Sequence, residues 1–170
     1  MISVDKITNL ANNITVPIKE LYNNRYLQRY QAVYTGGSWN PSNSYAWVPG
    51  SFVDFTPQRS DSLIQYAWRA PHAWINASNA IVHLQFYANG RLFKYHSLAG
   101  THLEDGDTYM WEVPSWGTFN ARIGCQIRSY AVNNHTLRFY DTNYWNGTGS
   151  RQTAYGQLMV DEVLGSGEVA

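Results

Sequence analysis

The chain has 170 residues, a length that suits one domain with a short appendage. Its 12 basic and 12 acidic side chains give a formal net charge of zero, and no basic run is present that could neutralise a phosphate backbone, so we expect no nucleic-acid partner. No apolar stretch approaches the ~20 residues needed to span a bilayer, and membrane insertion is therefore not expected either.

The first part of the chain carries an amphipathic pattern. Its apolar residues fall at positions a, d, a and a of a heptad: Ile7, Leu10, Ile14 and Leu21. This spacing predicts a helix of about three turns, which Pro17 would end because proline lacks the N–H that a helix needs. So short a seam is not stable alone. We therefore expect residues 1–24 to serve attachment or oligomerisation and residues 25–170 to form a head, while a helix packed on its own head fits the pattern equally well.

The rest of the sequence has the alternation and the turn residues of strands, without a second helical pattern. In one segment Ile64, Tyr66 and Trp68 share a face. The strand segments outside the hairpins are Leu27–Tyr34, Phe52–Thr56, Ser62–Trp68, Asp107–Val113 and Tyr155–Val163. Together with two hairpins they predict an all-β fold, an antiparallel, jelly-roll-like β-sandwich preceded by the short N-terminal α-helical segment.

The first hairpin is predicted by Asn89-Gly90, the pair favoured in a two-residue type I′ turn. If Ala88 pairs with Arg91, the alternation gives one apolar face and one polar face. The apolar face would pair Phe86 with Phe93 and Leu84 with Tyr95, and the polar face would pair Gln85 with Lys94 and His83 with His96. We expect the first face in the core and the second in water.

The second hairpin is predicted from Ala121–Tyr130 and Asn134–Asp141, joined by a three-residue loop. This register would pair Ile127 with Leu137 and Cys125 with Phe139. Cys125 is the only cysteine of the chain, which excludes an internal disulfide, and its place in a strand pattern favours a buried, unreactive thiol.

Catalytic and metal-binding motifs are absent from the sequence. The strings typical of acyl transfer, zinc proteases and nucleotide binding do not occur, and the five histidines have no metal-ligand spacing. The acidic run 104–107 lacks the spacing of a calcium loop and indicates a solvated turn. A carboxylate pair for glycoside hydrolysis could form among Asp54, Glu104, Asp107, Glu112 and Asp141, but 12 acidic residues make some such pair inevitable. We expect no enzymatic activity, no cofactor and no metal site.

Aromatic residues in the predicted loops are the better indication of a binding site. Flat aromatic rings stack on the C–H faces of sugars, and neighbouring amides bond to hydroxyl groups. The candidate ligand-binding residues on this ground are Trp39, Trp116, Tyr144, Trp145 and Asn146. The alternative is that the tryptophans seal the ends of the sandwich.

Four stretches of the sequence carry a family resemblance: Val113–Thr118, Ala121–Tyr130, Tyr144–Gly147 and Leu158–Glu162. Together they resemble head domains of bacteriophage virion proteins, namely the knobs of tail fibres, head fibres and capsid decoration proteins, particularly those of cyanophages and other aquatic phages. The resemblance lies in the head and includes no catalytic string.

The resemblance implies a non-enzymatic virion structural protein that is made in the host cytoplasm and displayed on the virion surface as a homotrimeric knob. Its N-terminal segment would attach it to other capsid or tail proteins, and its head would contact host-surface glycans. The residues expected to pack around the three-fold axis are Ile7, Leu10, Ile14, Ile18 and Leu21. The alternative function is that of a free-standing carbohydrate-binding β-sandwich lectin.

Overall fold

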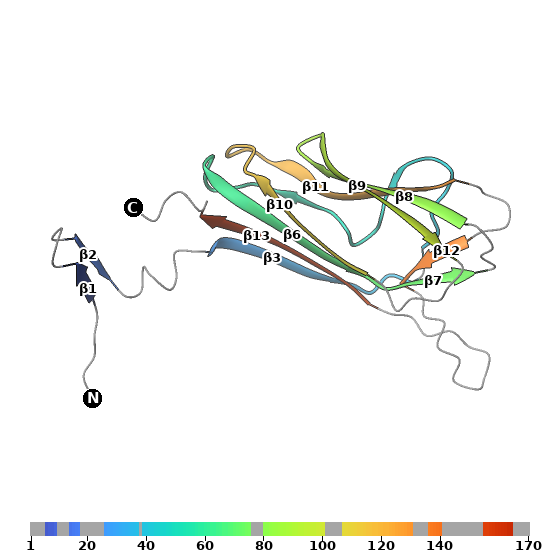
Figure 1. Ribbon diagram of the computed structural model, residues 1–170, viewed down its shortest axis with the longest axis horizontal. Helices are drawn as coiled ribbons and strands as arrows, with labels where there is room; N and C mark the ends of the chain where they lie inside the picture. The colour runs from blue at the N-terminus through green and yellow to red at the C-terminus, as the bar shows by residue number, and fades with distance from the viewer. Residues whose placement is uncertain are drawn as a thin grey trace, which may run out of the picture.

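The computed structural model describes residues 6–9, 14–17, 26–37, 39–75, 80–100, 107–130, 136–140 and 155–164. The predicted all-β fold is confirmed: two antiparallel sheets pack face to face as a sandwich (Figure 1). Among the described residues no helix has the length and hydrophobicity to cross a membrane.

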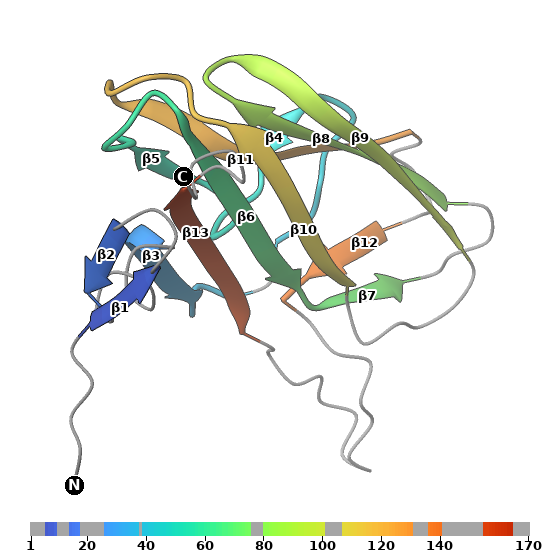
Figure 2. The same ribbon diagram turned by 60° about the vertical axis from the view of Figure 1, so that its left-hand side comes forward.

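The two sheets contain four and five strands. The four-stranded sheet has the order β10 (Asp107–Pro114), β6 (Ser62–Ala70), β13 (Gly156–Leu164) and β3 (Tyr26–Tyr34). The five-stranded sheet has the order β4 (Ala46–Trp47), β11 (Ala121–Ser129), β8 (Ala80–Ala88) and β9 (Arg91–Gly100), with β5 (Val53–Phe55) also paired to β11. Figure 2 shows β11, β8 and β9 as one layer beside β10, β6 and β13. A further pair, β7 (His72–Ile75) and β12 (Thr136–Phe139), lies at one end of the sandwich (Figure 1).

The core lies between the two sheets. Because side chains alternate along a strand, Ile64, Tyr66 and Trp68 of β6 all point inward and are buried, as predicted. Trp68 stacks on Tyr109 of β10 at a ring-centroid distance of 5.5 Å. Cys125 is buried in the same core, and burial raises the pKa of its thiol, in agreement with the expected unreactive side chain.

The helix predicted near the N-terminus is wrong where the structure describes that region. Lys6–Asn9 (β1) and Ile14–Pro17 (β2) are strands that pair with each other, with Ile7 opposite Val16. The β-branched residues of these segments favour a strand over a helix. Leu10, Ile18 and Leu21, the other residues of the predicted seam, lie outside the described residues.

The β8–β9 hairpin has the predicted turn, but its register is wrong beyond the first two pairs. Asn89 and Gly90 take the left-handed φ values of 50° and 70°, and Ala88 lies opposite Arg91. A register shift between Phe86 and Tyr87 then adds one residue to β9, a β-bulge that could not be read from the alternation. The pairs beyond it are Phe86 with Lys94, Gln85 with Tyr95, Leu84 with His96 and His83 with Ser97.

This shift exchanges the two faces of β9. Tyr95, expected in the core, now lies opposite Gln85 and is 47% exposed. His96, expected in water opposite His83, is half-buried, and its ring meets that of Tyr109 at 5.8 Å. The predicted exposed pair of histidines is therefore wrong.

The second predicted hairpin does not form. Strand β11 pairs with β8, which places Cys125 opposite Phe86, and β12 pairs with β7, which places Phe139 opposite His72. Adjacent alternating segments suggest a hairpin, but β8 offers β11 a longer apolar partner from a distant part of the sequence.

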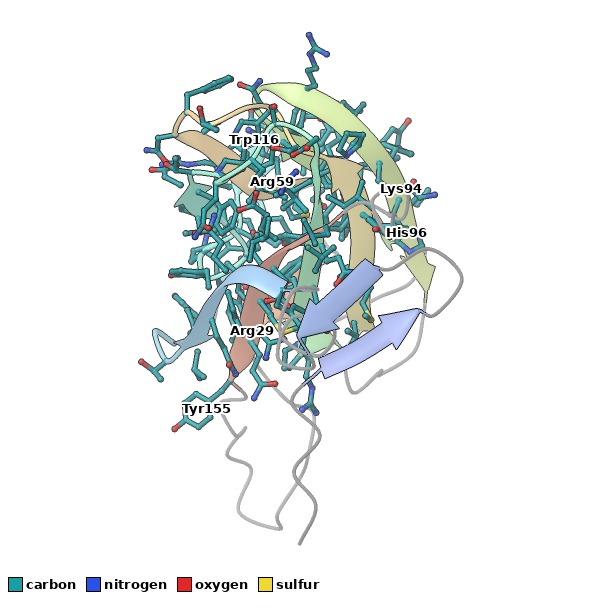
Figure 3. All side chains as sticks on the ribbon, turned by 90° about the vertical axis from the view of Figure 1, so that its left-hand side faces the viewer. Arg29, Arg59, Lys94, His96, Trp116 and Tyr155 are labelled. Atoms are coloured by element: carbon teal, nitrogen blue, oxygen red, sulfur yellow. The ribbon has the colours of Figure 1, made fainter. Side chains whose placement is uncertain are left out.

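Two acidic residues of β13 hold the edge strand β3 in place. The Arg29 guanidinium donates two hydrogen bonds of 2.8 Å to the carboxylate of Asp161, which is 1% exposed (Figure 3). This hydrogen-bonded carboxylate raises the pKa of Arg29. The side-chain amide of Gln28 donates to the next residue, Glu162, at 2.7 Å. No residue of β3 is fully buried, so these polar contacts and the backbone ladder fix the strand.

Glu162 is also fully buried, and it joins β13 to the segment before β6. Its carboxylate accepts hydrogen bonds from the backbone N–H groups of Gln58 at 2.7 Å and Arg59 at 2.9 Å, and from the Ser62 hydroxyl at 2.5 Å. Burial raises the pKa of Glu162, but the hydrogen bonds outweigh burial and hold it below the ordinary value. The charge of Glu162 therefore stabilises the fold.

Candidate functional site

Within the described residues, the outer face of the five-stranded sheet carries a group of aromatic side chains outside the core. Alternation sends Leu84 and Phe86 of β8 into the core and leaves His83, Gln85 and Tyr87 on the outer face. The strand register then aligns the outer residues in rows across β4, β11, β8 and β9. We call this surface the aromatic platform: Tyr45, Trp47, His83, Gln85, Tyr87, Tyr95, Ser97, Gln126, Arg128 and Tyr130.

One row of the platform runs across four strands. Trp47 lies opposite Gln126, which lies opposite Gln85, which lies opposite Tyr95. Two primary amides therefore stand between two aromatic rings. The amide of Gln85 accepts a hydrogen bond of 2.9 Å from the hydroxyl of Tyr87 in the neighbouring row.

Trp47 is fixed by its neighbours at one side of the platform. Its ring meets that of Tyr87 edge to face at 6.2 Å and that of Phe52 at 5.6 Å. The Arg122 guanidinium lies over both Trp47 and Phe52, at 5.6 and 4.7 Å from the ring centroids. Arg122 donates hydrogen bonds of 2.8 and 2.9 Å to Asp54, which lower the pKa of that carboxyl. These contacts limit the movement of the indole.

A glycine makes the close packing of Phe52, the neighbour of Trp47, possible. Gly124 lies in the platform row beside Tyr87 and has no side chain. A Cβ at this position would lie 2.3 Å from the Cβ of Phe52 and 2.8 Å from the carbonyl oxygen of Ser51. The chain before β5 can therefore lie directly on β11 only because residue 124 is glycine.

The other side of the platform is formed around His83. Its ring stacks on Tyr95 at 5.7 Å and meets Tyr130 edge to face at 6.3 Å. The Tyr95 hydroxyl and His83 Nδ1 share a hydrogen bond, and the Ser97 hydroxyl lies 3.1 Å from each. Tyr95 and Tyr130 are 47% and 71% exposed, so both can meet a ligand.

Arg128 occupies the position opposite His83. Its guanidinium carbon lies 4.9 Å from the centroid of the Tyr45 ring, and its Nε is buried without a hydrogen-bond partner. No described residue forms a salt bridge with Arg128, in contrast to Arg122, which is paired with Asp54. The platform therefore carries one guanidinium that is not neutralised within the described part of the chain.

The structure places two of the predicted ligand residues, Trp39 and Trp116, against the core, where both are partly buried. Trp39 pairs through its backbone with Phe139, and their rings lie 6.1 Å apart. Trp116 meets Phe55 edge to face at 6.2 Å, and its indole donates a hydrogen bond of 3.1 Å to the carbonyl of Phe119. The other three candidates, Tyr144, Trp145 and Asn146, lie outside the described residues.

Trp116 also lines a shallow groove of about 590 Å³ between the β8–β9 turn and the end of β10. Leu92, which is 49% exposed, lines the same groove. Figure 3 shows Trp116 beside Arg59, whose carbonyl accepts a hydrogen bond of 2.6 Å from the Ser115 hydroxyl. This groove contains fewer aromatic residues than the platform, and it is the weaker candidate for a site.

Sequence reasoning missed the platform because its residues lie on strands. The signal was present in the polar face of the predicted first hairpin, where His83 and Gln85 alternate with core residues. The bulge in β9 then adds Tyr95 to that face, which only the structure reveals.

The platform can bind by stacking and by hydrogen bonding. In the residues that the structure describes, no group of three or more His, Cys, Asp or Glu is placed to hold a metal ion. The polar groups of the aromatic platform are amides, hydroxyls, an imidazole and a guanidinium, which suit the recognition of a polar ligand with apolar faces.

Comparison with known proteins gives no family. No family model matches the chain, and no curated protein sequence matches it. Among the solved structures with distant similarity are two that each share 9% sequence identity with this chain: a structure described as "Bacillus endospore appendages form a novel family of disulfide-linked pili" and dimeric latent PorU from Porphyromonas gingivalis. The match to the first structure has a TM-score of 0.38 and covers 83% of this chain and 91% of that chain. The match to the second has a TM-score of 0.31 and covers 82% of this chain and 13% of that chain. Nothing about the function of this chain follows from similarities this low.

Proposed function

We propose that this chain is a non-enzymatic surface protein whose β-sandwich head binds a glycan on the aromatic platform. The observation that carries the proposal is the row of Trp47, Gln126, Gln85 and Tyr95 across one sheet face. Sugar rings present C–H faces bordered by hydroxyl groups, and this row places two amides between two aromatic rings, the kinds of group that complement them.

The rigidity of the platform supports the same conclusion. Binding costs less free energy when the side chains at the site are already ordered. Trp47 is held between Tyr87 and Phe52, and Tyr95 is stacked on His83. The half-buried Trp47 and the exposed Tyr95 therefore lose little conformational entropy when a ligand binds.

We further propose that the protein belongs to a phage virion, as the sequence resemblance implies, with the head displayed on the virion surface as a homotrimer. A helical seam no longer supports the trimer, because Ile7 and Ile14 lie in paired strands. Attachment to other virion proteins would then involve residues 1–24 in another form. A free-standing lectin would use the same platform, so the proposals differ in assembly and not in binding.

Glycan-array screening of the purified chain tests the binding proposal. Tyr95→Ala is expected to lower binding to any glycan that the wild type retains, whereas Tyr26→Ala is expected to leave it unchanged. The two tyrosines are exposed to similar extents, 47% and 51%, but Tyr26 lies on β3 in the opposite sheet. An array without hits, or equal losses in both variants, would contradict the proposal.

Adsorption to phage capsids that lack this protein separates the virion protein from the lectin. A virion protein is expected to bind such capsids stably as a trimer. A monomer that binds glycans and leaves capsids uncoated would support the lectin.

A further inference from the structure

We infer that the glycan bound on the aromatic platform is acidic, and that Arg128 binds a carboxylate of one of its sugars. The inference rests on the proposed glycan-binding function and adds the chemical class of the ligand. It depends on the charge balance of the platform, on the environment of Arg128 and on the groups around it.

On the outer face of β11, one of two arginines has no anionic partner among the described residues. Two arginines of β11 lie on the outer face of the sheet, Arg122 and Arg128. Arg122 is neutralised by the carboxylate of Asp54 through two hydrogen bonds. None of the described residues forms an ion pair or a side-chain hydrogen bond with Arg128. An anion brought by the ligand would balance this charge.

The environment of Arg128 prepares it for a planar anion. Its guanidinium carbon lies 4.9 Å from the centroid of the Tyr45 ring, a contact that limits its movement, and its Nε is buried. Arginine presents its N–H groups in a fixed fork that matches the two oxygens of a carboxylate. A guanidinium ordered in this way binds a carboxylate with less loss of side-chain entropy than a mobile surface arginine.

The groups around Arg128 fit the rest of an acidic sugar. The register continues from Arg128 to His83 and then to Ser97, and no carboxylate stands in this row to repel an anion. Tyr130, 71% exposed, meets the ring of His83 and offers a face for stacking beside the charge. A uronic or sialic acid has this combination of a carboxylate, hydroxyls and an apolar ring face.

The experiment uses the full chain on an array that holds carboxylated, sulfated and neutral glycans. We expect the protein to bind carboxylated glycans on the array. Reducing the carboxyl groups of the same glycans to alcohols is expected to abolish binding. Arg128→Gln is expected to weaken binding at least about tenfold, which corresponds to ~1.4 kcal/mol. The matched control is Arg69→Gln, which removes an exposed arginine from the outer face of β6 in the opposite sheet and is expected to have no effect.

The outcomes separate this inference from the proposed function. Hits on neutral or only on sulfated glycans would overturn the inference and leave glycan binding standing, whereas an array without hits would overturn both. Should Arg128→Gln fail to fold, as judged by circular dichroism, Arg128→Lys replaces it. Lysine keeps the charge without the fork, so a loss of binding in that variant is still expected, and unchanged binding would refute bidentate recognition.

Discussion

The buried carboxylate of Glu162 accepts a hydrogen bond of 2.9 Å from the backbone N–H of Arg59, and through it β13 holds the segment that leads into β6. Glu162→Gln would keep the shape of the side chain but remove its charge. We expect the free energy of unfolding to fall by about 1.5–3 kcal/mol, the range for hydrogen bonds to charged groups. Urea denaturation at neutral pH measures this difference, and an unchanged midpoint would contradict the stabilising role of the charge.

The same residue predicts a pH dependence of stability. The pKa of Glu162 in the folded protein is below its ordinary value, because hydrogen bonds outweigh burial. Its charge therefore stabilises the fold above the unfolded-chain value of about 4.3, and this contribution is lost as the pH falls through the lower folded-state pKa. We expect Glu162→Gln to lose less stability than the wild type below about pH 4.3. Thermal unfolding measured from neutral to acidic pH tests this. If the prediction is wrong, the unfolding temperatures of the wild type and Glu162→Gln fall in parallel as the pH is lowered.

Arg29 is expected to control the order of the edge strand β3. Arg29→Ala leaves Asp161, 1% exposed, as a carboxylate without its cation. We expect faster amide hydrogen exchange along β3 and a lower denaturation midpoint. Arg69→Ala, an exposed arginine of the same sheet, is the control and should change neither measurement. Equal protection of β3 in both variants would show that the backbone ladder alone holds the strand.

Gly124→Ala is expected to disturb the packing of Phe52 beside Trp47 on the platform. The new Cβ would lie 2.3 Å from the Cβ of Phe52, so the backbone around residue 52 must shift. Overpacking of this kind costs about 1–3 kcal/mol. Gly37→Ala, where a Cβ meets no atom within 4 Å, carries only the strain of its φ of 39°, and should cost less. Thermal denaturation compares the two, and the reverse order would contradict the packing of Phe52 on β11.

Trp47→Ala should weaken glycan binding by about tenfold or more, because the largest ring of the platform is lost. Trp47→Phe keeps an aromatic face and should lose less. Isothermal titration calorimetry with a glycan taken from the array measures both, after circular dichroism has confirmed that each variant is folded. Wild-type affinity in Trp47→Ala would place the ligand elsewhere, with the groove at Trp116 as the next candidate.

The proposed trimer predicts a mass. Light scattering of the full chain should give three times the mass of one copy, 19.4 kDa, and residues 25–170 alone should give a monomer. If residues 25–170 alone form a trimer, the contacts between subunits lie in the head and not in residues 1–24. A monomeric full chain would favour the lectin.

Local patterns predicted most strands of the head, although not the short strands β4 and β7, and they did not predict all of the strand partners. The alternation in β6 and the Asn89-Gly90 turn depend on neighbouring residues, and both were predicted correctly. The bulge in β9 and the pairing of β11 with β8 depend on contacts between distant segments, which no short pattern contains. The N-terminal pattern was ambiguous because Ile7 and Ile14 fit a heptad as well as a pair of strands.

The candidate site shows the same division. Aromatic residues were expected to bind from loops, and the structure places Trp39 and Trp116 against the core. The platform depends on which face of the sheet each strand residue occupies. For Tyr95 that face is set by the bulge in β9 between Leu92 and Lys94. A surface assembled from four strands cannot be read from any one of them.

The lone thiol of Cys125 offers an internal reporter of unfolding. It is fully buried and there is no second cysteine in the chain, so a thiol-labelling reagent can react only after the sandwich opens around it. The rate of modification at increasing denaturant would then measure opening of the core directly, without an introduced dye site and without any disulfide to complicate the chemistry.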